Sequence, residues 1–136
     1  MKAAPGQGVV SSAVLLSDCL DEIDYEWIGN DPAQVQSNYF AKGNTESYDR
    51  VEFHPNAGGQ EDFHTYSVDW TSERIKFGID GNEIRTLTAE KAGSNYPQTP
   101  MRVKTGIWAG GDSGNGDGTI GMSGLVMDDS FLARVN

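Results

Sequence analysis

The amino-acid sequence predicts an all-β domain built from short antiparallel strands. Among 136 residues there are 17 glycines, 10% aromatic residues and only 37% hydrophobic residues, a composition typical of strands joined by tight turns. Several segments also alternate apolar and polar side chains with the period of two that belongs to a strand with one buried face. The length suits one compact unit, so we expect residues 1–136 to form a single domain.

The strands can be placed one by one. Residues 8–16 form a β-branched, apolar run that begins at a glycine, which is typical of a buried strand. Residues 64–70 and 74–80 alternate on either side of a short polar break, which is a hairpin signature, and Asp80-Gly81-Asn82 supplies the next tight turn. The complete set of predicted strands is 8–16, 20–28, 37–41, 50–54, 64–70, 74–80, 83–87 and 102–108.

The strand at residues 20–28 places three carboxyl groups on one face. Successive side chains of a strand point to opposite sides, so Glu22, Asp24 and Glu26 share one side. The other side carries three large apolar side chains suited to packing against a second sheet, namely Ile23, Tyr25 and Trp27. The acids therefore face a surface or a cleft.

Three neighbouring carboxyls repel one another, so at least one should hold a proton near neutral pH, shared between Asp24 and an adjacent Glu. A retaining glycosidase needs two carboxyl groups roughly 5–5.5 Å apart. Regular strand spacing puts the Cα atoms of Glu22 and Glu26 about 13 Å apart, so their side chains must lean together over Asp24. The alternative to a pair of reacting carboxyls is an acidic stripe on a solvated strand face.

The segment Asp21-Glu22-Ile23-Asp24-Tyr25-Glu26-Trp27 resembles the ExDxE signature of glycoside hydrolase family 16, and within it the fungal Crh-type cell-wall transglycosylases. Similar blocks follow in the order of that family, so the resemblance covers roughly residues 3–120 and argues against a chance acidic stripe. These blocks are residues 4–12, 37–40, 64–70, 96–101 and 106–112.

The resemblance implies a retaining reaction through a covalent glycosyl-enzyme. In it Glu22 would be the nucleophile, Glu26 the general acid/base, and Asp24 the group that orients and tunes Glu22. A Crh-type enzyme would transfer chitin to β-1,3/1,6-glucan and needs no cofactor. Two alternatives stay open, a β-1,3(4)-glucan hydrolase of the same family and a catalytically silent carbohydrate-binding remnant.

Candidate sugar-binding residues are aromatic, because flat rings pack against the C–H faces of pyranoses. Tyr39, Phe40 and Trp108 are the candidates, with core packing as the alternative for each and the favoured one for Phe40. His64 is a candidate to hydrogen-bond substrate, and a structural histidine is the alternative.

The implied fold is a β-jelly-roll sandwich of two antiparallel sheets, expected to be N-terminally incomplete because family domains carry more strands before the motif. Residues 121–125 and 126–136 also depart from the family pattern. By resemblance the protein would be secreted to the cell wall, although residues 1–8 lack the apolar core of a signal peptide.

Composition and charge exclude several other classes. A net charge of -10 would repel phosphate and anionic lipid headgroups, so we expect neither nucleic acid nor a membrane surface as partner, and no run is long enough for a membrane helix. Cys19 is the only cysteine and the Cys and His residues lack zinc-ligand spacing. The glycine-rich segment 110–118 reads as a loop whose acidic residues do not follow the EF-hand spacing, so we expect no metal.

Overall fold

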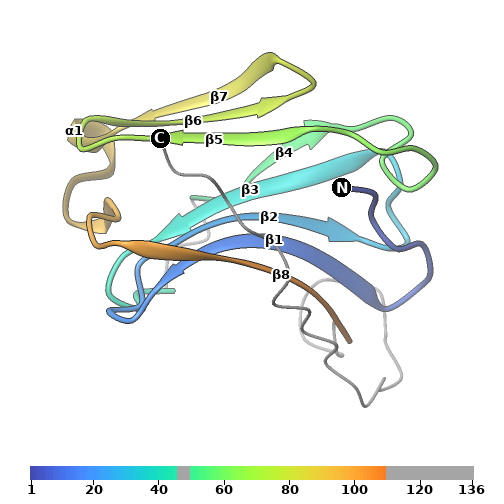
Figure 1. Ribbon diagram of the computed structural model, residues 1–136, viewed down its shortest axis with the longest axis horizontal. Helices are drawn as coiled ribbons and strands as arrows, with labels where there is room; N and C mark the ends of the chain where they lie inside the picture. Colours follow the sequence, from blue (N-terminus) through green and yellow to red (C-terminus); the bar gives the residue numbers. More distant parts are fainter. Residues whose placement is uncertain (46–49, 110–136) are drawn as a thin grey trace.

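A computed structural model describes residues 1–45 and 50–109, in which two antiparallel sheets lie one above the other (Figure 1). The larger sheet has the order β4-β3-β2-β1-β8 and the smaller the order β5-β6-β7. The larger contains β1 (Val9–Ser17), β2 (Glu22–Ile28), β3 (Gln34–Phe40), β4 (Glu52–Pro55) and β8 (Met101–Ala109). The smaller contains β5 (Tyr66–Trp70), β6 (Arg74–Ile79) and β7 (Asn82–Thr88). The predicted all-β sandwich is confirmed.

Each of the eight predicted segments contains a strand, with small shifts at the ends. Strand β5 begins at Tyr66, two residues after the predicted start, because the preceding backbone is bound elsewhere. The His64 amide donates to the Met1 carbonyl at 3.0 Å and the Thr65 amide to Asp80 Oδ1 at 2.8 Å. A short α-helix, α1 (Ala89–Ala92), and a 3-10 helix, η2 (Gly93–Asn95), were not predicted. Thr88 caps α1 by accepting a hydrogen bond from the Lys91 amide.

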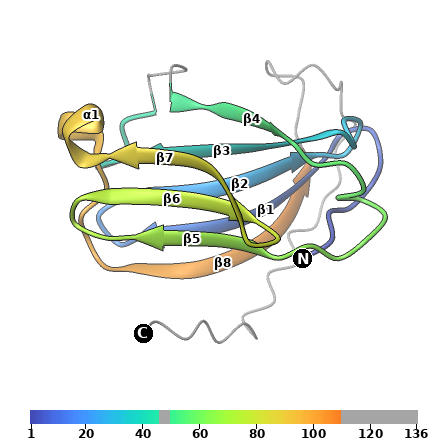
Figure 2. The same ribbon diagram turned by 90° about the horizontal axis from the view of Figure 1, so that it is seen from above.

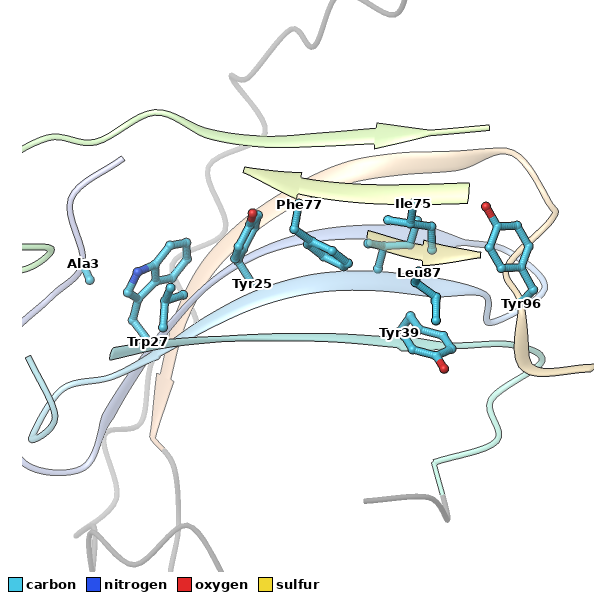
Figure 3. Close-up of a cluster of buried hydrophobic side chains, with 10 residues drawn as sticks. Ala3, Tyr25, Trp27, Tyr39, Ile75, Phe77, Leu87 and Tyr96 are labelled. Atoms are coloured by element: carbon cyan, nitrogen blue, oxygen red, sulfur yellow. The ribbon is translucent and has the colours of Figure 1, made fainter. Parts of the chain in front are cut away.

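The core lies between the two sheets and is rich in aromatic side chains (Figure 3). Ile23, Tyr25 and Trp27 point into it from β2 and are almost completely buried, as predicted from the alternation of the strand. The Tyr25 ring meets Phe77 edge to face, with ring centroids 5.4 Å apart. Its hydroxyl donates to the Gly78 carbonyl at 3.1 Å, so β2 is fixed to the smaller sheet by both packing and a hydrogen bond.

The larger sheet is bowed toward the smaller one, and its far side is concave (Figure 1). We call this far side the outer face; it consists of the side chains that point away from β5, β6 and β7. Strand β2 is the central strand of the five, so its outward-pointing residues lie in the middle of that face (Figure 2). Within residues 1–45 and 50–109, no helix is long and apolar enough to cross a membrane.

Candidate active site

The three acids of β2 lie together on the outer face. Because Ile23, Tyr25 and Trp27 fill the core, the pleat of the strand turns Glu22, Asp24 and Glu26 the opposite way. Their cross-strand neighbours on β3 share that face, and the register pairs Glu22 with Phe40, Asp24 with Asn38 and Glu26 with Gln36. The larger sheet thus presents a carboxyl row flanked by two amides and one aromatic ring.

Asp24 is the most deeply buried of the three, with only 3% of its surface exposed. Burial raises its pKa well above the ordinary value, and the charges of Glu26 and Glu22 and a hydrogen bond with Glu22 raise it further. Arg85 acts in the opposite direction and does not cancel these effects. The hydrogen bond between the two groups raises the pKa of Asp24 and lowers that of Glu22, so Asp24 is the donor in it and is the carboxyl that favours the proton.

The two glutamates differ in their partners. Burial raises the pKa of Glu22, while the hydrogen bond from Asp24 and the charge of Lys104 favour its ionised form. Burial also raises the pKa of Glu26, where the hydrogen bond from Gln36 opposes the shift and the negative charge of Glu22 adds to it. The pKa of both glutamates is therefore raised, and the two differ in what opposes the shift: Asp24 and Lys104 at Glu22, and the Gln36 amide at Glu26.

Asp21 holds the beginning of the carboxyl strand in place. It is 3% exposed, and its Oδ1 accepts the Lys42 amide at 2.9 Å. Its Oδ2 accepts the Gln98 amide, the Thr99 amide and the Thr99 hydroxyl at 2.8, 2.9 and 2.8 Å. Burial acts to raise the pKa of Asp21, but these four hydrogen bonds outweigh it and leave the pKa below its usual range. One carboxylate thus ties β2 to the segments after β3 and before β8.

The end of β2 is held by a close approach of backbone. Gly29 donates to the Val9 carbonyl at 2.7 Å and accepts the Gly6 amide at 3.1 Å. A Cβ at Gly29 would lie 2.2 Å from the Gly6 oxygen, so only glycine fits here. The carboxyl strand is therefore fixed at both ends.

The candidate sugar-binding residues do not all lie near the carboxyls. Tyr39 points into the core and is 6% exposed, which supports the core-packing alternative. His64 lies beside the smaller sheet, across the core from the outer face, with its Nδ1 2.6 Å from Asp80 Oδ2. Trp108 on β8 pairs with Val10 and shares the outer face with the carboxyls. Phe40 also lies there, opposite Glu22, although core packing was the favoured interpretation for it.

Three residues on this face had not been singled out as candidates. They are Gln36 and Asn38 on β3, and Lys104 on β8. Lys104 and Asp24 both pair with Val14 of β1, one on each side of it. The signal that could have found the first two is the alternation of β3: once Val35 and Ser37 are assigned to the core, residues 36, 38 and 40 must face outward with the acids. Within the described residues, no group of three or more His, Cys, Asp or Glu could hold a metal ion.

A buried aspartic acid between two glutamates, on the open face of an antiparallel β-sandwich, is an arrangement of neighbouring carboxyls of the kind that glycoside hydrolases use. Comparison with known proteins agrees and is more specific. The family model described as glycosyl hydrolases family 16 matches residues 1–124, and the chain belongs to this family.

Relatives similar in sequence include proteins of fungi. A Crh-like protein of Arthroderma benhamiae is 60% identical over 128 residues, which are 94% of this chain and 28% of that protein. Crh-like protein 4 of Aspergillus fumigatus is 59% identical over 128 residues, again 94% of this chain and 28% of the relative. The chain thus spans less than a third of the length of these curated relatives.

Solved structures show the same likeness. The Crh5 transglycosylase in complex with NAG matches with a TM-score of 0.79 and 56% identity, covering 85% of this chain and 48% of that one. A Bacillus licheniformis β-glucanase matches with a TM-score of 0.74 and 28% identity, covering 91% of this chain and 57% of that one. The sandwich described above is therefore the one found in this family's solved structures.

Proposed function

We propose that this chain carries the catalytic strand of a retaining Crh-like transglycosylase that acts on β-linked cell-wall polysaccharide. The observation that supports it most strongly is the buried Asp24 between Glu22 and Glu26, whose pKa is raised well above its ordinary value. A solvated acidic stripe would leave all three acids exposed with ordinary pKa values, whereas burial raises the pKa of each of them here.

The proposed reaction has two displacements. Glu22 attacks the anomeric carbon of the donor sugar, while Glu26 gives its proton to the leaving glycosidic oxygen, so that a covalent ester to Glu22 forms as the glycosidic bond breaks. Glu26, now ionised, then removes a proton from the acceptor hydroxyl, whose oxygen displaces Glu22. Asp24 keeps its proton throughout and stabilises the Glu22 carboxylate before the first step and after the second.

The acceptor decides between transfer and hydrolysis. We propose transfer from chitin to β-1,3/1,6-glucan, because the relatives are fungal Crh-like proteins and a similar structure is a transglycosylase solved with NAG. Trp108 and Phe40 would bind sugar, since both lie on the outer face. The relatives also support secretion to the fungal cell wall as the place of action.

Hydrolysis of β-1,3(4)-glucan is the second candidate function. It is supported by the likeness to the β-glucanase of Bacillus licheniformis, which is 28% identical over 91% of this chain. Product analysis separates the two. Elongated, labelled acceptor indicates transfer, and a predominance of new reducing ends indicates hydrolysis.

The test uses labelled chito-oligosaccharide and laminari-oligosaccharide acceptors with the wild-type chain and its Glu22→Gln variant. Transfer is expected in the wild type and should be abolished in the variant, because the neutral amide cannot form the ester. Glu90→Gln, the same chemical change on exposed α1, serves as the matched control and should retain transfer. Undiminished transfer by Glu22→Gln would overturn the assignment. Sugar binding by the wild-type chain without turnover would instead support a silent carbohydrate-binding domain.

A further inference from the structure

Behind the carboxyl row, on the core side of the larger sheet, lies a buried cation. Arg85 belongs to β7 in the smaller sheet and is only 7% exposed. Its side chain crosses the core and reaches the larger sheet at β3. Its guanidinium carbon lies 5.5 Å from the centroid of the Tyr39 ring and 5.4 Å from that of Phe77, which places the group between an aromatic ring of each sheet.

The polar contacts of Arg85 converge on β3 and on the chain just before β4. Its Nη1 donates to the Ser37 carbonyl at 2.9 Å and to the Ser37 hydroxyl at 2.8 Å, and its Nη2 donates to the Arg50 carbonyl at 2.7 Å. Its Nε lies 3.2 Å from Glu52 Oε1, at the edge of the core. Most of the hydrogen bonds of the guanidinium group are therefore to main-chain and hydroxyl oxygens, and they fix the position of β3.

Ser37 is the residue through which this contact passes to the site. It is completely buried, and its hydroxyl lies 2.8 Å from Nε2 of His54. Burial lowers the pKa of His54, and the charge of Arg85 lowers it further while Glu52 opposes, so the ring is neutral at neutral pH. The hydroxyl can then accept from Arg85 and donate to His54, and Ser37 is held from two sides.

The neighbours of Ser37 along the strand face the carboxyls. Gln36 and Asn38 lie on the outer face, opposite Glu26 and Asp24, and the Gln36 amide donates to Glu26 Oε2. Because adjacent residues of a strand move together, a shift of Ser37 changes the position of the Gln36 amide. We propose that Arg85 is a positioning residue which, through Ser37, holds Gln36 in hydrogen-bonding contact with the general acid/base Glu26.

A purely structural account does not explain this choice of residue. Removing a guanidinium from water is costly, and apolar residues of similar volume often replace buried ion pairs with no loss of stability. Methionine would fill the space between the aromatic rings, but it would bind neither the carbonyl nor the hydroxyl of Ser37. We therefore attribute the presence of a buried arginine here to the hydrogen bonds with which it fixes β3.

The first test reads Glu26 directly, by NMR titration of ¹³C-labelled glutamate carboxyls in the full 136-residue chain. The titration must account for the groups around the network, which are Glu22 and Asp24 on β2, Glu52 and His54 on β4, and Lys104 on β8. Gln36→Met should raise the pKa of Glu26, because Gln36 stabilises the ionised form. Arg85→Met should also raise the pKa of Glu26, and this rise should be smaller in a chain that already carries Gln36→Met.

Arg85→Lys separates position from charge, since lysine keeps the charge and loses the fork. Positioning predicts a shift of the Glu26 pKa in Arg85→Lys as well, whereas a purely electrostatic role predicts no shift. An unchanged Glu26 in Arg85→Met, or an equal effect with and without Gln36, would overturn the proposal. If the Arg85 variants do not fold, Ser37→Ala, which removes one acceptor of the fork, should still raise the pKa of Glu26, and no shift there would count against the proposal.

The second test uses turnover and rests on the proposed function. Arg85→Met should lower kcat by about tenfold or more with little change in KM. Arg85 lies on the core side and does not touch sugar, so its loss should misplace a reacting group without weakening substrate binding. An effect on KM alone would contradict a positioning role. Absence of turnover by the wild-type chain would count against the proposed function, whereas the NMR titration would still decide the role of Arg85.

Discussion

Replacing Asp21 with Asn should destabilise the fold strongly, although the change removes no atom from the core. The carboxylate accepts four hydrogen bonds, three of them on Oδ2 from Gln98 and Thr99. An asparagine has one oxygen, so whichever way the amide turns, its NH₂ group meets a partly buried N–H donor. The variant also loses the charge that strengthens the remaining bonds.

The size of the effect follows from these contacts. A hydrogen bond to a charged group contributes about 1.5–3 kcal/mol, and a buried donor left without an acceptor costs about 1–3 kcal/mol. Since part of the network survives on the remaining oxygen, we expect the free energy of unfolding to fall by about 2–4 kcal/mol. This is a large fraction of the ~5–15 kcal/mol typical of a domain.

Urea unfolding followed by tryptophan fluorescence measures this difference, and pH checks its cause. Because the folded-state pKa of Asp21 is lowered from 3.8, its contribution is present above the unfolded value and is lost as the pH falls through the folded value. The gap between wild type and Asp21→Asn should therefore close in acid. Asp18→Asn is the control: its ion pair with Arg102 is exposed, so the midpoint should not change. A gap that is absent at neutral pH, or independent of pH, would refute this reasoning.

Three further predictions concern β2 and its neighbours. Asp24→Asn should abolish turnover yet stabilise the fold at neutral pH: wild-type stability is full below the unfolded-state pKa of 3.8 and falls as the pH rises from there to the raised folded-state pKa, whereas Asn stays neutral. Urea midpoints at acidic and alkaline pH check this. Tyr25→Phe should lower the free energy of unfolding by about 1 kcal/mol, measured in the same way, since the Gly78 carbonyl loses its donor. In Gln36→Met, the alkaline limb of the pH profile of kcat/KM should move to higher pH, because Glu26 retains its proton longer.

Each of these has an outcome that would contradict it. For Asp24→Asn, a loss of stability relative to the wild type as the pH is raised would contradict the prediction. An unchanged midpoint in Tyr25→Phe would mean that water replaces the hydroxyl at no cost. A shift of the Gln36→Met limb toward acid would indicate that Gln36 favours the protonated form of Glu26.

Much of the fold and part of the site were predictable from local patterns. Alternation within residues 20–28 determined that three acids share one face and three apolar side chains the other, because side-chain direction in a strand depends only on the pleat. The resemblance to family 16 likewise rested on a contiguous motif, and the family model confirms it. The same rule applied to β3 would have placed Phe40 outward and Tyr39 inward, once Val35 was recognised as core.

The sequence by itself thus determined the strands, the identity of the three carboxyls and the family to which they belong. Only the tertiary structure decided which carboxyl has the most strongly raised pKa, since that depends on the burial of Asp24 in the folded sheet. It also decided which long-range contacts anchor β2 and β3. Asp21 accepts hydrogen bonds from Gln98 and Thr99, which lie 77 and 78 positions later in the sequence, and Arg85 donates to Ser37, 48 positions before it. Side-chain alternation is a local property of the backbone, whereas desolvation and long-range hydrogen bonds arise only when distant segments pack together.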